Sequence, residues 1–354
     1  MSLLDKIKKN STIKDSSILS KSKFFNQKDM IATGVPMINV ALSGKLDGGL
    51  TPGLTMWAGP SKHFKTAFSL LMAKSYMEKY PESVMLFYDS EFGTPIKYFE
   101  TFDIDMERVI HTPLTDIEQL KFDIMQQLQG IERNDKLIIV LDSIGNLASK
   151  KEVEDALEGK SVADMSRAKQ VKSLFRMVTP HLSLKDIPMI VVNHTYKTME
   201  LYAKDVVGGG TGSYYSADNI FIIGRQQEKD GTEITGYNFI INVEKSRYVK
   251  EKSKIPIAVA FEGGIQKFSG LLDIAIEGKF VAKPSPGWYS KIDRTTGEIE
   301  STKVRFPATQ TEDFWKDILS SEEFKEFVRK KYEIAYGSIM GETALLEEET
   351  ADET

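Results

Sequence analysis

Residues 53–66 read Gly-Leu-Thr-Met-Trp-Ala-Gly-Pro-Ser-Lys-His-Phe-Lys-Thr, and this stretch decides the fold. The apolar run 54–58 has the length of a buried strand, and an apolar helical pattern begins after residue 66. Between them, residues 59–66 match the phosphate-binding loop G-x-x-x-x-G-K-[ST], except that Phe64 replaces the second glycine. Strand, loop and helix in this order predict that backbone N–H groups and the helix N-terminus hold a polyphosphate.

The side chains of this loop have separate expected tasks. Lys65 should reach the β- and γ-phosphates, and the Thr66 hydroxyl should bind Mg²⁺. If position 64 needs a positive φ, a bulky residue there costs about 1–2 kcal/mol, so the packing around Phe64 must hold it in place. The other expected phosphate contacts come from Gly59, Pro60, Ser61, Lys62, His63 and Phe64.

A second apolar run, 84–88, is followed by Asp89-Ser90-Glu91. Carboxylates just past the carboxyl end of a strand lie where open α/β sheets bind ligands. Because in-line hydrolysis needs a proton acceptor near the γ-phosphate, Glu91 is the candidate that activates the attacking water. We expect its strand to lie directly beside the strand of residues 54–58. A carboxylate that only forms a surface salt bridge is the alternative.

Residues 137–142, Leu-Ile-Ile-Val-Leu-Asp, form the clearest buried strand. A run of four or more apolar residues that ends in Asp is the pattern in which the carboxylate holds Mg²⁺ through water, which makes Asp142 a metal candidate. Paired with the phosphate loop, this strand indicates an NTPase. Helices are expected near 115–129 and after a cap at Ser161, and further strands at 187–192, 220–224, 237–244 and 256–261.

Two segments follow strands of this set without a clear pattern of their own. Residues 145–162 are charged, and residues 195–217 contain Gly208-Gly209-Gly210-Thr211-Gly212. We expect both to be functional loops without helix or strand. From residue 268 the chain forms a small appendage, in which Ser320-x-x-Glu323 predicts the start of a helix.

The composition excludes several classes of protein. The chain has 354 residues, and no apolar run approaches the roughly 20 residues that span a bilayer. The absence of cysteine excludes disulfides and thiolate chemistry, and the four histidines show no metal-binding spacing. A net charge of −5 weakens the case for nucleic-acid binding without excluding it, because a local basic groove matters more than the total.

Five segments stand in one order along the chain: Gly-Pro-Ser-Lys-His-Phe-Lys-Thr (59–66), Phe-Tyr-Asp-Ser-Glu-Phe-Gly (87–93), Asp-Ser-Ile-Gly-Asn-Leu-Ala-Ser-Lys-Lys-Glu (142–152), Val-Asn-His-Thr-Tyr (192–196) and Gly-Gly-Gly-Thr-Gly (208–212). Together they resemble the RecA-like DNA strand-exchange proteins, and among them the phage recombinases, in which an aromatic residue also precedes the lysine. The resemblance runs from about residue 22 to residue 289. It implies an α/β fold: a RecA-like P-loop NTPase core with a mostly parallel central sheet flanked by helices. The implied parts are an N-terminal oligomerisation arm (1–30), the core (31–267), a small C-terminal α/β domain (268–340) and an acidic tail (341–354).

The resemblance also implies roles for single residues. Tyr98 matches the aromatic that stacks on adenine, and His194 stands where the family senses the γ-phosphate and can reposition residues 195–217. Lys245 and Arg247 match a basic pair that reaches the ATP of an adjacent subunit. The structural alternatives are a core tyrosine, a satisfied buried histidine and a solvated basic turn.

The segments 145–162 and 195–217 match the DNA-binding loops of recombinases. Basic residues interleaved with aromatics suit single strands, because phosphate neutralisation and base stacking do not depend on sequence. The candidate DNA contacts are Lys150, Lys151, Lys160, Tyr196, Lys197, Lys204, Gly208, Gly209 and Gly210, with Tyr202 beside them.

The implied function is ATP-dependent homologous recombination: filaments on single-stranded DNA, pairing with duplex DNA, strand exchange and DNA-stimulated ATP hydrolysis with ATP and Mg²⁺. Implied partners are single- and double-stranded DNA, further copies of the chain, a phage single-strand-binding protein and a recombination mediator, in the host cytoplasm and without a membrane. Two alternatives remain open, a hexameric helicase with a RecA core and a non-catalytic ATP-dependent filament or regulatory module.

Overall fold

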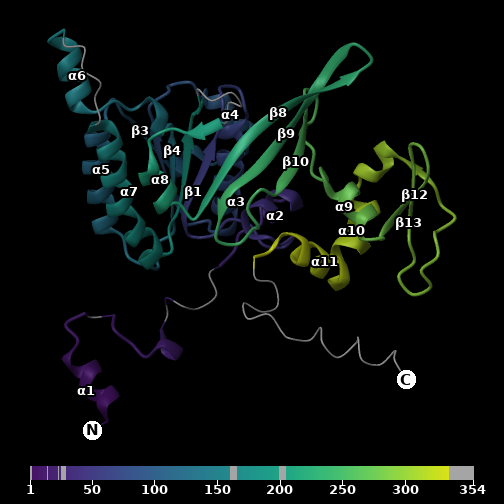
Figure 1. Cartoon of the computed structure of the whole chain (residues 1–354), viewed down its shortest axis with the longest axis horizontal. Helices are drawn as coiled ribbons and strands as arrows, with labels where there is room; N and C mark the ends of the chain where they lie inside the picture. Colours follow the sequence, from purple (N-terminus) through teal and green to yellow (C-terminus); the bar gives the residue numbers. More distant parts are fainter. Residues whose placement is uncertain are drawn as a thin grey trace, which may run out of the picture.

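A nine-stranded sheet runs through the body of the computed structural model, which describes residues 2–13, 15–22, 24, 29–159, 166–198 and 205–334 (Figure 1). The strands lie in the order β11 (Gly264–Ile265), β10 (Lys254–Ala260), β9 (Glu233–Ser246), β8 (Asn219–Asp230), β1 (Gly53–Ala58), β5 (Pro188–Asn193), β4 (Leu137–Asp142), β2 (Val84–Asp89) and β3 (Val109–Pro113).

The sheet has a parallel part and an antiparallel part. Strands β8, β1, β5, β4, β2 and β3 are parallel neighbours, whereas β9, β10 and β11 continue the sheet antiparallel. The mostly parallel central sheet predicted from the sequence is confirmed. The expected adjacency of the strand before Glu91 to β1 is wrong, because β5 and β4 lie between β1 and β2. Crossover connections in a doubly wound sheet separate strands that follow one another in the chain.

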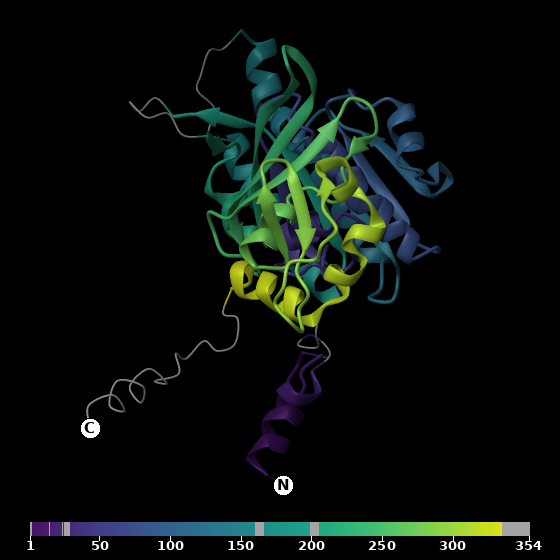
Figure 2. The same cartoon turned by 90° about the vertical axis from the view of Figure 1, so that its right-hand side faces the viewer.

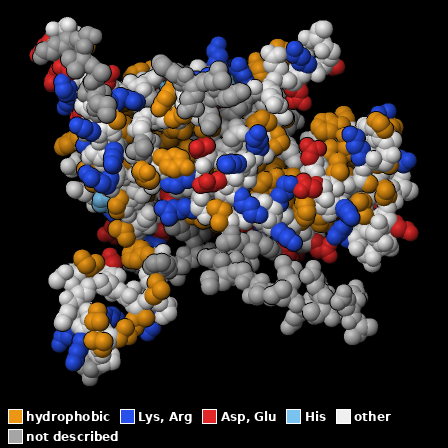
Figure 3. Space-filling view, in the orientation of Figure 1, with side chains coloured by type: hydrophobic (Ala, Val, Ile, Leu, Met, Phe, Trp, Pro, Cys, Tyr) orange, Lys and Arg blue, Asp and Glu red, His pale blue; other side chains and the backbone are white. Residues whose placement is uncertain are grey.

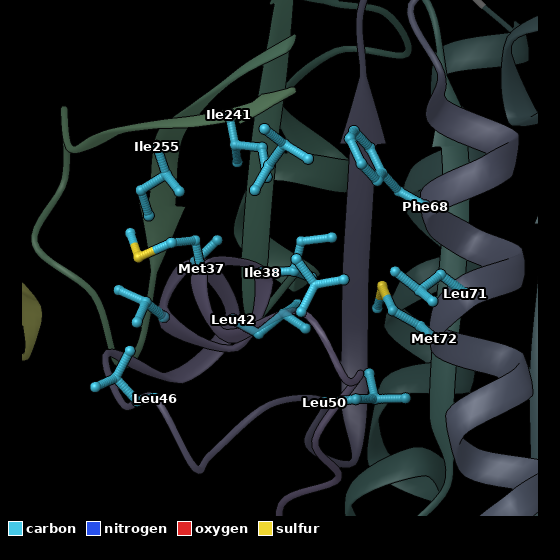
Figure 4. Packing of buried hydrophobic residues seen from close by; sticks show 14 of the residues in the cluster. Met37, Ile38, Leu42, Leu46, Leu50, Phe68, Leu71, Met72, Ile241 and Ile255 are labelled. Atoms are coloured by element: carbon cyan, nitrogen blue, oxygen red, sulfur yellow. The ribbon is translucent and has the colours of Figure 1, made fainter. Parts of the chain in front are cut away.

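Helices cover both faces of the sheet, so the architecture has three layers. On one face, α5 (Ile117–Gly130) and α7 (Ser166–Lys185) bury their apolar stripes against β1, β4 and β5. On the other face, α2 (Pro36–Ser43) and α3 (Lys65–Lys79) share one apolar cluster with β9 and β10 (Figure 4). Since strands buried on both faces read as continuous apolar runs, this explains the patterns of residues 137–142 and 187–192.

The two segments expected to lack secondary structure contain some. Segment 145–162 carries the end of a 3-10 turn (Ile144–Asn146) and α6 (Lys150–Leu157), which starts at a capping box of Ser149 and Glu152. Segment 195–217 carries β6 (Thr195–Lys197), β7 (Asp205–Val207) and α8 (Thr211–Ser216). The expectation was wrong because local caps and a two-stranded pairing stabilise short elements that hydrophobic periodicity does not reveal. The predicted helix cap at Ser161 lies outside the described residues.

The last part of the chain adds a small unit beside β10 (Figure 1). Its apolar side chains join the cluster beneath α2 and α3, which makes one continuous core. The cap of the final helix is Ser321, whose hydroxyl accepts from the Phe324 N–H, and not Ser320 as predicted. The unit consists of α9 (Leu271–Glu277), β12 (Val281–Ser285), β13 (Trp288–Lys291), β14 (Val304–Arg305), a 3-10 helix (Phe306–Gln310), α10 (Glu312–Ser320) and α11 (Glu322–Tyr332). The acidic tail 341–354 lies outside the described residues.

The N-terminal segment begins with α1 (Leu3–Asn10), which stands away from the body (Figure 2). Its residues Leu3, Leu4 and Ile7 are exposed, and apolar side chains are scattered over the surface of this arm (Figure 3). Phe24 contacts the core of its own chain, with the Arg133 guanidinium carbon 4.8 Å from its ring centroid. No helix in the described ranges has both the length and the apolarity needed to cross a bilayer.

Candidate active site

A cavity of about 610 Å³ opens at the carboxyl ends of the parallel strands. Residues 61–67, the end of the phosphate loop and the start of α3, form one wall. Glu91 follows β2, His194 follows β5, and Tyr98 lies on α4 (Ile96–Thr101); all three also line the cavity. The sequence-predicted nucleotide residues of different elements therefore meet in one place, as expected for the carboxyl edge of an open α/β sheet.

The backbone at Phe64 has the positive φ that is unfavourable for a residue with a bulky side chain. Phe64 has φ +61°, in the left-handed region, and α3 begins directly after it at Lys65. The Lys65 amine donates to the Pro60 carbonyl at 2.8 Å. Burial lowers the pKa of Lys65, while the carboxylates of Glu91 and Asp142 oppose that shift. The buried amine thus lies near enough to Glu91 and Asp142 for both carboxylates to favour its charged form.

Thr66 and Asp142 form the candidate Mg²⁺ site. The Thr66 hydroxyl donates to Asp142 Oδ2 at 2.6 Å, and Asp142 is only 2% exposed. Within the described part of the chain, Asp142 Oδ1 is buried without a hydrogen-bond partner. A hydroxyl and a carboxylate are oxygen ligands of the kind that Mg²⁺ prefers, and an unpaired buried oxygen is a free acceptor for its water shell. These residues therefore fit the ion.

Asp142→Asn is expected to stabilise the protein without nucleotide and Mg²⁺. Burial is the main cause that raises the pKa of Asp142 to about 6. A carboxyl whose pKa is higher in the folded than in the unfolded state lowers the free energy of unfolding as the pH rises from the unfolded pKa, near 4, through the folded pKa of about 6. The amide of the Asp142→Asn variant does not ionise. Its free energy of unfolding should therefore exceed that of the wild type by about 3 kcal/mol at pH 7.5 and by about half of that at pH 5.

Urea unfolding at the two pH values measures this gain. Asp230→Asn, at the exposed end of β8, is the matched control and should change the free energy of unfolding equally little at both. A gain for Asp142→Asn that does not depend on pH would contradict the explanation by burial.

Glu91 is held by two neighbours. His194 Nε2 and the Ser143 hydroxyl each donate to Glu91 Oε1 at 2.7 Å. The hydrogen bond from His194 is the first cause that lowers the pKa of Glu91, although burial opposes it. Asp89 fixes the turn, because its Oδ1 accepts from the backbone N–H groups of Glu91 (3.1 Å) and Phe92 (2.8 Å). Glu91 is therefore ionised and oriented at the mouth of the cavity.

A short path leads from this pair to the second predicted loop. The Gly208 N–H donates to the His194 carbonyl at 2.9 Å, and the Asn193 side-chain amide donates to the Gly208 carbonyl at 2.8 Å. Both polar backbone groups of Gly208 are thus used inside the protein. The Gly208 N–H is therefore used within the protein in this structure, and a role of Gly208 in DNA contact stays a prediction. Gly209 and Gly210 follow with φ of +90° and +73°, which favours glycine.

The other candidate DNA contacts lie on short elements at the surface. Lys150 and Lys151 open α6, which projects from the body (Figure 1), and Lys151 contacts Asp155 one turn later. Tyr196 and Lys197 are exposed on β6. Lys160, Tyr202 and Lys204 lie outside the described residues.

Lys245 and Arg247 lie at the opposite edge of the sheet. Arg247 forms an ion pair with Asp218, whose Oδ2 accepts from the Leu54 N–H at the start of β1. The phosphate loop begins after the other end of β1, roughly 16 Å away at about 3.3 Å per residue. The Lys245 amine donates to the Tyr214 carbonyl at 2.6 Å. This pair therefore does not belong to the phosphate site of its own chain.

Sequence reasoning missed several residues of the site. Ser143 directly follows the predicted metal carboxylate, but no motif pointed to its contact with Glu91. Arg225, Tyr237 and Phe239 also line the cavity. They lie on β8 and β9, which pattern alone identified only as strands, and no signal in the sequence marks them as part of the site.

Comparisons with known proteins agree with this geometry. The family model described as the RecA N-terminal domain matches residues 2–266, and the C-terminal domain model of the bacteriophage T4 recombination and repair protein matches residues 268–328. The recombination and repair protein of Enterobacteria phage T4 is 52% identical over 336 residues, 94% of this chain and 86% of that protein. The RecA protein of Streptomyces avermitilis is 24% identical over 74% of this chain and 68% of its own length. For the RecA protein of Clostridioides difficile the identity is 23%, over 78% of each chain.

Proposed function

This chain belongs to the RecA family, and from that premise we propose how its residues carry out ATP-dependent recombination. It is a homologous-recombination and repair protein and a DNA-dependent ATPase, as its relationship to the phage T4 protein and to RecA proteins indicates. The observation that supports the residue assignment is one cavity lined by the phosphate loop, Glu91 and His194, with Asp142 hydrogen-bonded to Thr66 of that loop.

In the proposed site, the loop 59–66 cradles the triphosphate with its backbone N–H groups at the start of α3. Lys65 exchanges its contact with Pro60 for the β- and γ-phosphates, and Tyr98 stacks on the base. Thr66 and Asp142 would hold Mg²⁺, which would supply positive charge against the phosphate oxygens for phosphoryl transfer. The cavity of about 610 Å³ is large enough for a ligand of this class.

Glu91 is the proposed acceptor that positions the attacking water. In the present conformation His194 and Ser143 occupy its Oε1, so a hydrogen bond from His194 to the γ-phosphate would release the carboxylate for water. General-base assistance of this kind contributes about 10²–10⁴-fold to a rate. The Gly208 N–H donates to the His194 carbonyl, so a backbone shift at His194 would also displace Gly208, which supports coupling between the nucleotide and segment 195–217.

Segments 145–162 and 195–217 are the proposed DNA-binding segments. Their described basic and aromatic side chains are exposed, as contacts to a single strand require. The exposed apolar side chains of α1 support a docking role for the N-terminal arm on a further copy, in a filament. Lys245 and Arg247, remote from their own phosphate loop, are assigned to the ATP of the adjacent subunit.

The proposal includes ATP and Mg²⁺, single- and double-stranded DNA, and a phage single-strand-binding protein and mediator as partners in the host cytoplasm. Strand exchange between a circular single strand and a homologous linear duplex tests it. Joint molecules should form with ATP and be absent without it. Unwinding of a duplex without homology would favour a helicase, and ATP-independent products would contradict the proposal.

A further inference from the structure

Two residues of the phosphate loop have backbone conformations that glycine normally supplies. Lys62 has φ +60° and Phe64 has φ +61°. A side chain with a Cβ disfavours this region by about tenfold in an equilibrium constant. Other parts of the protein must therefore hold the loop in this shape.

Phe64 is held by an aromatic cluster. Its ring stacks on Phe239 of β9, with centroids 5.0 Å apart and an interplanar angle of 22°. It also meets Phe68 of α3 edge-on at 5.5 Å, and Phe68 meets Phe239 at 6.2 Å. The cluster continues from Phe68 to Trp57 of β1 at 5.3 Å. Such aromatic pairs stabilise the structure beyond what the burial of their apolar area contributes, and this offsets the backbone strain at position 64.

Lys62 is held by β8, which forms an antiparallel hairpin with β9. Arg225 of β8 donates from Nη1 to the Lys62 carbonyl at 3.2 Å. Its guanidinium carbon lies 4.6 Å from the centroid of the Tyr237 ring on β9, a cation–π contact that fixes the arginine. At Gly59 a Cβ would come within 3.1 Å of the Ile223 carbonyl, so the loop also runs close against β8. One hairpin thus contacts the loop at three positions.

We propose that the β8–β9 hairpin sets the nucleotide-binding conformation of the phosphate loop, through Phe239 on Phe64 and Arg225 on the Lys62 carbonyl. In this chain aromatic packing replaces the missing glycine. Phe239 and Arg225 are positioning residues, because they act on the loop and not on the reacting atoms. The inference rests on the proposed function, since it assumes that this loop binds ATP. It also predicts that anything that moves the hairpin changes the affinity for ATP.

A double-mutant cycle tests the role of Phe239 on Phe64. The measured quantity is the Kd of a slowly hydrolysed ATP analogue with Mg²⁺ and without DNA. Phe239→Leu should weaken binding about tenfold in the wild-type loop and less than about twofold in Phe64→Gly. Phe64→Gly should stay within about threefold of wild type, whereas Phe64→Ala should bind about tenfold more weakly than Phe64→Gly. Alanine keeps the strained Cβ and loses the ring, while glycine removes the strain.

The outcomes separate this inference from the proposed function. Equal effects of Phe239→Leu in both loops, or Phe64→Gly binding no better than Phe64→Ala, would overturn the inference while ATP binding itself remains. A wild-type protein without measurable ATP binding would instead contradict the proposed function.

Arg225→Met tests the contact of Arg225 with the Lys62 carbonyl. Because Arg225 is exposed, the protein should still fold. KM for ATP should rise about threefold with turnover at saturating ATP unchanged, because the residue affects only the loop. A fall in turnover with an unchanged KM would mean that Arg225 acts on the reaction and would overturn its assignment as a positioning residue.

Discussion

Glu91→Gln is expected to reduce DNA-stimulated ATP turnover at least about 100-fold while ATP binding changes less than about threefold. The amide cannot accept the proton of the attacking water, and general-base assistance is worth about 10²–10⁴-fold. It can still accept hydrogen bonds from His194 and Ser143, so the geometry of the turn is retained. Phosphate release under saturating single-stranded DNA, together with an equilibrium titration of ATP, measures both quantities.

The matched control is Glu100→Gln on α4, an exposed carboxylate of the same helix as Tyr98. Its turnover should equal that of the wild type. If Glu91→Gln turned over ATP at the wild-type rate, Glu91 would not be the group that activates water.

Lys65→Ala should lose about 100-fold in affinity for ATP, which corresponds to about 3 kcal/mol. The Lys65 amine is buried at the start of α3, where its charge-assisted hydrogen bonds to phosphate are stronger than in water. Strand exchange should be absent at ATP concentrations that saturate the wild type. Because burial already lowers the pKa of this amine, its removal should not reduce the free energy of unfolding of the nucleotide-free protein.

Lys74→Ala on the same helix is the control. Lys74 is half-buried and pairs with exposed Glu78 one turn later at 3.1 Å, and an ion pair that reaches solvent in this way contributes little to stability. Wild-type ATP affinity in this variant, next to a large loss in Lys65→Ala, separates the phosphate contact from a general effect of removing a lysine. Equal affinities in both variants would contradict the assignment of Lys65.

The chemistry of the site could be predicted largely because its groups follow local patterns. The phosphate loop, the carboxylate after residues 137–141 and the carboxylate after residues 84–88 each depend on one strand and the residues beside it. Strand order is a non-local property, and the sequence therefore could not show that β5 and β4 separate β2 from β1. Glu91 nevertheless enters the cavity, since all parallel strands end at the same edge.

The contacts between elements could not be predicted. Nothing near Phe64 in the chain identifies Phe239, 175 residues later, as the ring beneath it. The same is true of Ser143 and His194, which converge on Glu91 from different strands. Short elements were missed for another reason: α6 depends on the capping box at Ser149, and it buries no residue that would give an apolar period.

The central claim is that ATP, held between Lys65 and Glu91, controls the segments that bind DNA. The most direct measurement is the affinity of Glu91→Gln for single-stranded DNA in ATP, in ADP and without nucleotide, at one salt concentration. The account predicts at least about tenfold tighter binding with ATP than in the other two states, persisting because the triphosphate is not hydrolysed. Equal affinities in all three states would contradict it.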